Sequence, residues 1–267
     1  MSVADQIAAQ LPYLRRYARA LTGSQSSGDA YVRATLEAAL ADRSLLDQMG
    51  GGRTALYTAF NRIWSSIQDG EDNADVEVTF GSVHEQAAQL HLSHIAPAHR
   101  QALLLTTLED FSQDETALIL DIPVAEVTSL IAQAVQEIDQ ETATEVLIIE
   151  DEPLISMQLE GLVTDLGHTV VGTAATHSQA LELFAARPAG LVLADIQLAD
   201  GSSGIDAVED LLKFGDVPVI FITAYPEKLL TGERPEPTYL VTKPFQEATV
   251  RAAISQALFF GSSRALA

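Results

Sequence analysis

The stretch VLIIEDEP, from Val146 to Pro153, is a short apolar run, rich in Val and Ile, that ends in three acids. Three later runs are also too short for core helices and also end in polar residues: GLVLADIQL (Gly190 to Leu198), VPVIFITAYP (Val217 to Pro226) and TYLVTKPF (Thr238 to Phe245). Such runs are typical of parallel strands that are buried on both faces. The sequence therefore predicts four buried strands in the C-terminal half.

Segments with helical periodicity lie between these runs. Leu154 to Leu166 is stopped by Gly167, and Ser178 to Ala186 is followed by Pro188. Strands that alternate with helices predict an α/β doubly wound sheet. Ligands bind at the carboxyl ends of the strands in such sheets, and the polar residues of the four runs fall there.

The acids at these strand ends are the types that a phosphorylatable aspartate pocket needs. Glu150, Asp151 and Asp195 offer oxygen ligands that suit Mg²⁺, which would also relieve their mutual repulsion. We include Gln197 in the predicted metal set. Asp195 would be the nucleophile toward a phosphoryl group, and therefore the phosphoacceptor.

Two further strand-end residues complete the predicted pocket. Thr223 would hydrogen-bond to the phosphoryl oxygens, and Lys243 would pair with them. The bond between Lys243 and Pro244 is a candidate for a cis peptide, which would point the lysine inward.

This half, from about Thr144 to Leu258, resembles a response-regulator receiver domain, because the acid pair, the Asp, the Thr and the Lys-Pro occur in that family's order. The resemblance implies a flavodoxin-like fold and a bound Mg²⁺. Receivers usually carry a switch aromatic three residues before the lysine, but Leu240 stands there and Tyr239 is one position earlier. The segment Glu227 to Pro237 looks like a loop where a helix is common, so the switch is expected to involve this segment or Tyr239 and Leu240.

Length and composition predict two domains, since 267 residues exceed one typical domain and the chain is 47% hydrophobic. No signal peptide or membrane segment is expected, and there is no cysteine, so we expect a cytoplasmic protein. The net charge of -22 predicts repulsion from nucleic acid.

The first half, Met1 to about Gln140, has helical periodicity and predicts a helix-turn-helix near its end. Pro97 opens a helix through Leu108, and Ser112 with Glu115 makes a capping box for a helix to Leu120. After the turn Asp121 to Pro123, a third helix is predicted to bury one face, formed by Val124, Val127, Leu130, Ile131, Ala134, Val135 and Ile138.

The string from Leu92 to Ile138 resembles region 4 of extracytoplasmic-function sigma factors, with its Pro-led helix, its Leu-Glu-aromatic-Ser turn and its Val-led third helix. Upstream, three segments resemble the polymerase-binding helices of sigma region 2: Leu11 to Ser24, Tyr31 to Leu40 and Leu56 to Trp64. A plain amphipathic helical bundle would explain these three segments almost as well.

The charge of this half departs from that of a DNA-binding sigma factor. The third helix, from Val124 to Gln140, contains no Lys or Arg, and Arg100 is the only basic residue between Glu85 and Gln140, against nine acids. The stretch Gln68 to Thr79 is acidic and lacks the residues that hold a promoter strand. We therefore expect no DNA binding.

A sigma-like shape without DNA-binding charge, fused ahead of a receiver, resembles the PhyR family of alphaproteobacterial general stress response regulators. The resemblance implies that a sensor histidine kinase phosphorylates Asp195, and that the sigma-like decoy domain then opens and sequesters an anti-sigma factor of the NepR type, which frees the true sigma factor. The expected organisation is an all-α sigma-like domain at 1–140 (region 2 at 1–66, acidic linker at 67–84, region 4 at 85–140), a receiver at 144–258 and a tail at 259–267.

Two other functions stay open at this point. A DNA-binding transcription regulator with a receiver-controlled helix-turn-helix is the alternative, which the acidic third helix disfavours. A magnesium-dependent phosphatase would need an acid-base Asp two residues after Asp195, where Gln197 stands, so no enzyme is expected. His91 and His94 could join His84 or His99 on a metal, but without Cys or a paired acid they are expected to be surface residues.

Overall fold

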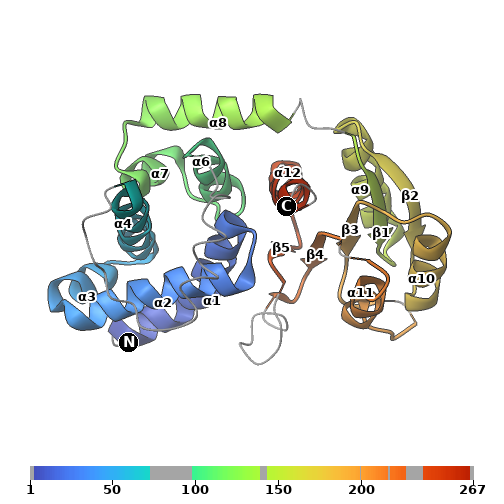
Figure 1. Cartoon of the computed structure of the whole chain (residues 1–267), viewed down its shortest axis with the longest axis horizontal. Coiled ribbons are helices and arrows are strands. Elements are labelled where there is room, and N and C mark those ends of the chain that lie inside the picture. The colour runs from blue at the N-terminus through green and yellow to red at the C-terminus, as the bar shows by residue number, and fades with distance from the viewer. Residues whose placement is uncertain are drawn as a thin grey trace. The chain divides into compact units, whose positions relative to one another are not determined.

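The computed structural model describes residues 3–72, 98–138, 143–198, 200–215, 217–226 and 237–264, with side chains described for 3–66, 98–138, 143–198, 200–215, 217–226 and 237–259. The chain divides into two compact units, Met1–Gln133 and Ala134–Ala267 (Figure 1). No single helix among the described residues has the length and hydropathy to cross a membrane; the adjacent helices Gln113–Leu120 and Val124–Ile138, bent by 100°, meet that test only as a pair.

The first unit is helical. Its elements are α1 (Val3–Thr22), α2 (Gln25–Ala41), α3 (Arg43–Met49), α4 (Arg53–Asp72), α6 (Ala98–Thr107), α7 (Gln113–Leu120) and most of α8 (Val124–Ile138). Side chains cap several of these helices, as at α7, where Ser112 and Glu115 form the expected capping box. Helix α7 then ends at Asp121, which has a left-handed backbone (φ 56°).

A buried ion cluster joins the early helices of this unit to the turn that follows α6. The Glu109 carboxylate accepts hydrogen bonds from Arg16 Nε (3.0 Å), Arg53 Nη2 (2.8 Å) and the Tyr57 hydroxyl (2.8 Å). The ring of Phe111 lies 4.9 Å from that of Tyr57, centroid to centroid. Because Glu109 is 1% exposed, this contact fixes the region-4-like helices against α1 and α4.

The second unit is an α/β sandwich with a five-stranded parallel sheet in the order β2-β1-β3-β4-β5. The strands are β1 (Glu145–Ile149), β2 (Thr169–Ala174), β3 (Leu191–Ala194), β4 (Val219–Thr223) and β5 (Tyr239–Thr242), and the helices are α9 (Pro153–Asp165), α10 (His177–Ala186), α11 (Gly204–Leu212) and α12 (Glu247–Arg264). The flavodoxin-like fold is thus confirmed, and β2, which was not among the four predicted strands, is an edge strand with only one fully buried residue.

The central strands are buried on both faces, as their unbroken apolar sequences predict. Leu147 and Ile149 face a core that α10 and α11 complete, and these two helices pack on each other. The alternate residues Val146 and Ile148 are equally buried, so the acids that follow β1 and β3 leave strands that are covered on both faces.

One sequence expectation needs correction, and three bounds of the structure add detail to the predicted domain organisation. Helix α4 continues to Asp72, into the predicted linker at 67–84, and α12 continues to Arg264, into the predicted tail at 259–267; a helix that is already nucleated extends at little cost, even through a glycine. The two compact units meet at 133/134, inside α8, and the domain bounds at 140 and 144 stay a prediction. Val124 and Val135 of α8 are 39% and 45% exposed, so its predicted core face is narrower.

Candidate phosphoacceptor pocket

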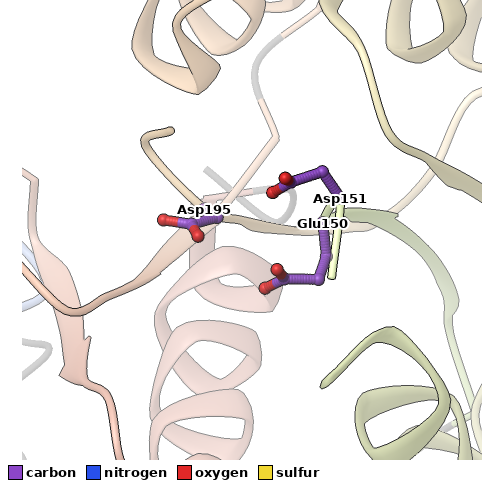
Figure 2. A group of neighbouring side chains, drawn as sticks. All are labelled: Glu150, Asp151 and Asp195. Atoms are coloured by element: carbon purple, nitrogen blue, oxygen red, sulfur yellow. The ribbon is translucent and has the colours of Figure 1, made fainter. Parts of the chain in front are cut away.

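Three carboxylates converge where strands β1 and β3 end. Glu150 and Asp151 directly follow β1, and Asp195 directly follows the adjacent β3 (Figure 2). One oxygen from each lies within 4.8 Å of the others. Glu150 is 3% exposed and Asp195 8%, while Asp151 is half-buried. Hard oxygen donors at this spacing fit Mg²⁺.

Lys243 lies across two of these acids. Its Nζ is 2.7 Å from Asp195 Oδ2, 2.7 Å from Glu150 Oε2 and 3.6 Å from Glu152 Oε1. The peptide between Lys243 and Pro244 is cis, as the sequence predicts. Sequence reasoning missed Glu152, although it is the third acid of the EDE run and could have been found there.

Burial and charge pull the pKa values in this pocket in opposite directions. Burial raises the pKa of Glu150 above its ordinary value, although Lys243 opposes that rise. Burial alone would lower the pKa of Lys243, but its hydrogen bonds to Asp195 and Glu150 raise it above the ordinary value. The ammonium therefore stays charged and neutralises part of the acidic cluster.

The other oxygen of Asp195 is held by the backbone. Asp195 Oδ1 accepts the N–H of Ile196 at 2.6 Å and that of Gln197 at 3.4 Å. The Gln197 side chain is exposed, and its backbone pairs with Ser203 in an isolated antiparallel bridge. Gln197 lies two residues after Asp195 in the chain. Its role as a metal ligand stays a prediction.

The predicted switch residues lie on the last two strands. Thr223 is fully buried at the end of β4, and its hydroxyl accepts the N–H of Tyr225. Tyr239 is buried on β5 with its hydroxyl donating to the Gln256 carbonyl of α12 at 3.3 Å, and Leu240 belongs to the sheet core. Most of the predicted loop, residues 227–236, lies outside the described residues.

The histidines considered for a metal, and expected to be surface residues, are mostly outside the described part of the chain. His84, His91 and His94 lie outside the described residues, and His99 is half-exposed at the start of α6. Among the described residues, the acids Glu150, Asp151 and Asp195 are the one group that could hold a metal ion.

Several arginines of the sigma-like half are paired with acids of the same half. Its eight basic residues up to position 140 are all Arg. Arg15 and Arg19 pair with Asp29, and Arg16 and Arg53 pair with Glu109. Since phosphate binding needs cations that face solvent, this pairing removes much of the charge that a DNA-binding surface would use.

Comparison with known families accounts for most of the chain. Residues 7–61 match the Sigma2 domain of PhyR, residues 92–141 match the sigma-like domain of the response regulator PhyR, and residues 146–255 match the response regulator receiver domain.

Similar proteins have the same organisation. The phyllosphere-induced regulator PhyR of Methylorubrum extorquens is 52% identical over 264 residues, which are 98% of this chain and 97% of that protein. The crystal structure of PhyR from Brucella abortus is 48% identical with a TM-score of 0.83, covering 100% of this chain and 98% of that one. The anti-anti-sigma factor PhyR from Bartonella quintana is 48% identical with a TM-score of 0.84, covering all of both chains.

A sigma-like helical half followed by a receiver with a strand-end acidic pocket defines a response regulator whose output half copies a sigma factor. The relatives named above are regulators and not enzymes. The chain belongs to the PhyR family of response regulators. This membership confirms the family resemblance of the sequence, and it does not favour a DNA-binding transcription regulator.

Proposed function

We propose that this chain is a phosphorylation-activated anti-anti-sigma factor of the cytoplasm. A sensor histidine kinase would supply the phosphoryl group to Asp195, and the sigma-like half would then sequester an anti-sigma factor of the NepR type and free the true stress sigma factor. A second structure of the Bartonella quintana relative, also 48% identical to this chain, is described as a complex of PhyR with the anti-sigma factor NepR. The observation that carries the receiver side of the proposal is the Asp195 carboxylate, ion-paired to Lys243 beside two further acids.

The pocket supports transfer of a phosphoryl group to Asp195. In this step the N–P bond of a phosphohistidine breaks, an O–P bond forms to a carboxylate oxygen of Asp195, and the imidazole leaves with the bonding electron pair. Glu150, Asp151, Asp195 and Gln197 would hold Mg²⁺, which neutralises charge on the phosphoryl oxygens. The backbone amides at Oδ1 keep the carboxylate in one orientation before the donor arrives.

Lys243 and Thr223 would report the phosphoryl group to the rest of the receiver. Lys243 now pairs with Glu150 and Asp195, and new phosphoryl oxygens would compete for its ammonium. The buried Thr223 hydroxyl would exchange its bond to the Tyr225 amide for one to the phosphoryl group. Tyr239 and Leu240, on the neighbouring strand, are the residues through which this change would reach α12.

The sigma-like half supports capture of a protein partner over DNA. Its arginines at 15, 16, 19 and 53 are in internal ion pairs, and the described part of α8 carries acids and no basic residue. Such a surface suits a partner helix with basic residues around apolar anchors. Two states are implied, one that binds this partner and one that does not. If the phosphoryl group favoured the binding state by about 5.5 kcal/mol, the molecule would change from almost wholly unavailable to almost wholly available to the partner.

The test is capture of a purified NepR-type anti-sigma factor by the full chain, with and without beryllofluoride and Mg²⁺. We expect strong capture only with the phosphoryl mimic, and none by Asp195→Ala under either condition. Asp206→Ala, which changes an exposed aspartate of α11, is the matched control and should behave like the wild type. Equal capture with and without the mimic would reject the switch, and specific binding of duplex promoter DNA would restore the transcription-regulator alternative.

A further inference from the structure

The chain between β3 and α11 folds back onto the residue that we assign as phosphoacceptor. Gln197 and Ser203 pair as an antiparallel bridge, and the N–H of Gly204 donates to the Ile196 carbonyl at 3.0 Å. Ser203 caps α11 by accepting the N–H groups of Ile205 and Asp206. The first residue of α11 therefore lies directly on the backbone of Asp195 and Ile196.

Gly204 has no room for a side chain. A Cβ at this position would lie 1.7 Å from the carbonyl oxygen of Asp195, 2.9 Å from its carbonyl carbon and 3.4 Å from the Cα of Ile196. The first distance is about half of an ordinary contact between carbon and oxygen. The backbone of Gly204 is not left-handed, so the close approach is what requires glycine here. Among the described glycines of the receiver half, Gly204 alone would meet backbone atoms this closely.

The contact falls on the peptide group that orients the Asp195 carboxylate. The carbonyl of Asp195, against which Gly204 packs, and the N–H of Ile196, which donates to Asp195 Oδ1 at 2.6 Å, belong to the same peptide group. That group is planar and rigid, so a push on its oxygen also moves its N–H. The N–H of Asp195 is itself bonded to the Ile149 carbonyl at 2.8 Å, which limits the ways in which the backbone can yield.

We propose that Gly204 is a positioning residue for phosphorylation, because the start of α11 rests on the Asp195–Ile196 peptide and thereby fixes the orientation of the Asp195 carboxylate. The inference rests on the proposed role of Asp195. Gly204 has no side chain to offer a donor or a metal, and it would act through the peptide amide. A displacement of the nucleophile by about 1 Å lowers a transfer rate by up to about 100-fold.

The experiment measures labelling of the full-length protein by acetyl phosphate at saturating Mg²⁺ over a series of donor concentrations. Gly204→Ala should lower the maximal rate at least tenfold and leave the half-saturating donor concentration within about threefold, since it alters orientation and not access. Gly161→Ala is the matched control, because nothing lies within 4 Å of its Cβ position in α9, and it should label like the wild type. The short hydrogen bond of the Ile196 N–H to Asp195 Oδ1 should place this amide downfield in the NMR spectrum of the wild type and of Gly161→Ala, and Gly204→Ala should move it upfield.

A second variant covers the outcome in which Gly204→Ala does not fold. Ser203→Ala removes the cap that holds the start of α11 without adding an atom, and it should lower the maximal rate severalfold. If Gly204→Ala folds and is labelled at the wild-type rate, the inference is overturned. If Gly204→Ala does not fold, a wild-type rate in Ser203→Ala overturns it instead. Continued labelling of Asp195→Asn would instead overturn the proposed phosphoacceptor, so the two failures can be told apart.

Discussion

Replacing Glu109 by alanine should strongly destabilise the sigma-like half. The Glu109 side chain is fully buried, and it is paired with Arg16, which is 6% exposed, and with Arg53, whose side chain is 33% exposed. Without the carboxylate, Arg53 can turn toward water. Arg16 would keep its bond to the Leu108 carbonyl at 2.9 Å but would lose its 2.9 Å ion pair with Glu109.

The magnitude follows from this difference between the two arginines. Breaking a buried ion pair by removing one partner costs about 3–5 kcal/mol, because a charge is left buried and unpaired. The total stability of a domain is about 5–15 kcal/mol. With a urea m-value of about 2 kcal/mol/M, the unfolding midpoint of Glu109→Ala should fall by about 1.5–2.5 M.

The protein carries its own probe for this measurement. Trp64 is the single tryptophan of the chain. It is 1% exposed and packs on Tyr31 and Phe60 in the same half, so its emission in urea reports the unfolding of that half. Glu37→Ala removes an exposed glutamate from α2 as the control, with an expected midpoint shift close to zero. If Glu109→Ala shifts the midpoint no more than Glu37→Ala, the buried cluster does not hold the helices together.

Three further outcomes are expected. Asp151→Asn should weaken Mg²⁺ binding in calorimetry at least tenfold, since one ligand charge is lost from the cluster, and an unchanged titration would remove Asp151 from the metal set. Lys243→Ala should still be labelled by acetyl phosphate, but its capture of the anti-sigma factor should respond to beryllofluoride at least fivefold less, and a full response would place the reporting elsewhere. Burial lowers the pKa of His168 below its ordinary value of 6.5, and its Nδ1 accepts the Thr144 N–H. The unfolded chain therefore binds more protons than the folded chain between the two pKa values. The stability that is present above pH 6.5 is lost as the pH falls through the lower pKa of the folded state. The difference in unfolding midpoint between the wild type and His168→Gln should accordingly change only below about pH 6.5, and a constant difference would refute this assignment.

Local sequence was enough to predict most of the receiver and its pocket. Buried parallel strands need unbroken apolar runs, and polar residues at their ends must face one edge of the sheet, so strand order and residue type were sufficient to place Glu150, Asp195 and Lys243 together. The capping box of Ser112 and Glu115 was readable for the same reason, since its partners are three residues apart. The edge strand β2 was missed because its mixed burial leaves no such pattern.

The tertiary structure alone decided the features that depend on residues far apart in the chain. Composition showed an acidic protein, but it could not show that Arg16 and Arg53 are paired with Glu109, 93 and 56 residues away. Nor could it show that a Cβ at Gly204 would strike the carbonyl of Asp195, because that contact depends on the path of the intervening loop. Periodicity and spacing report which face of an element is buried, whereas the partner that buries it is chosen by packing across the whole unit.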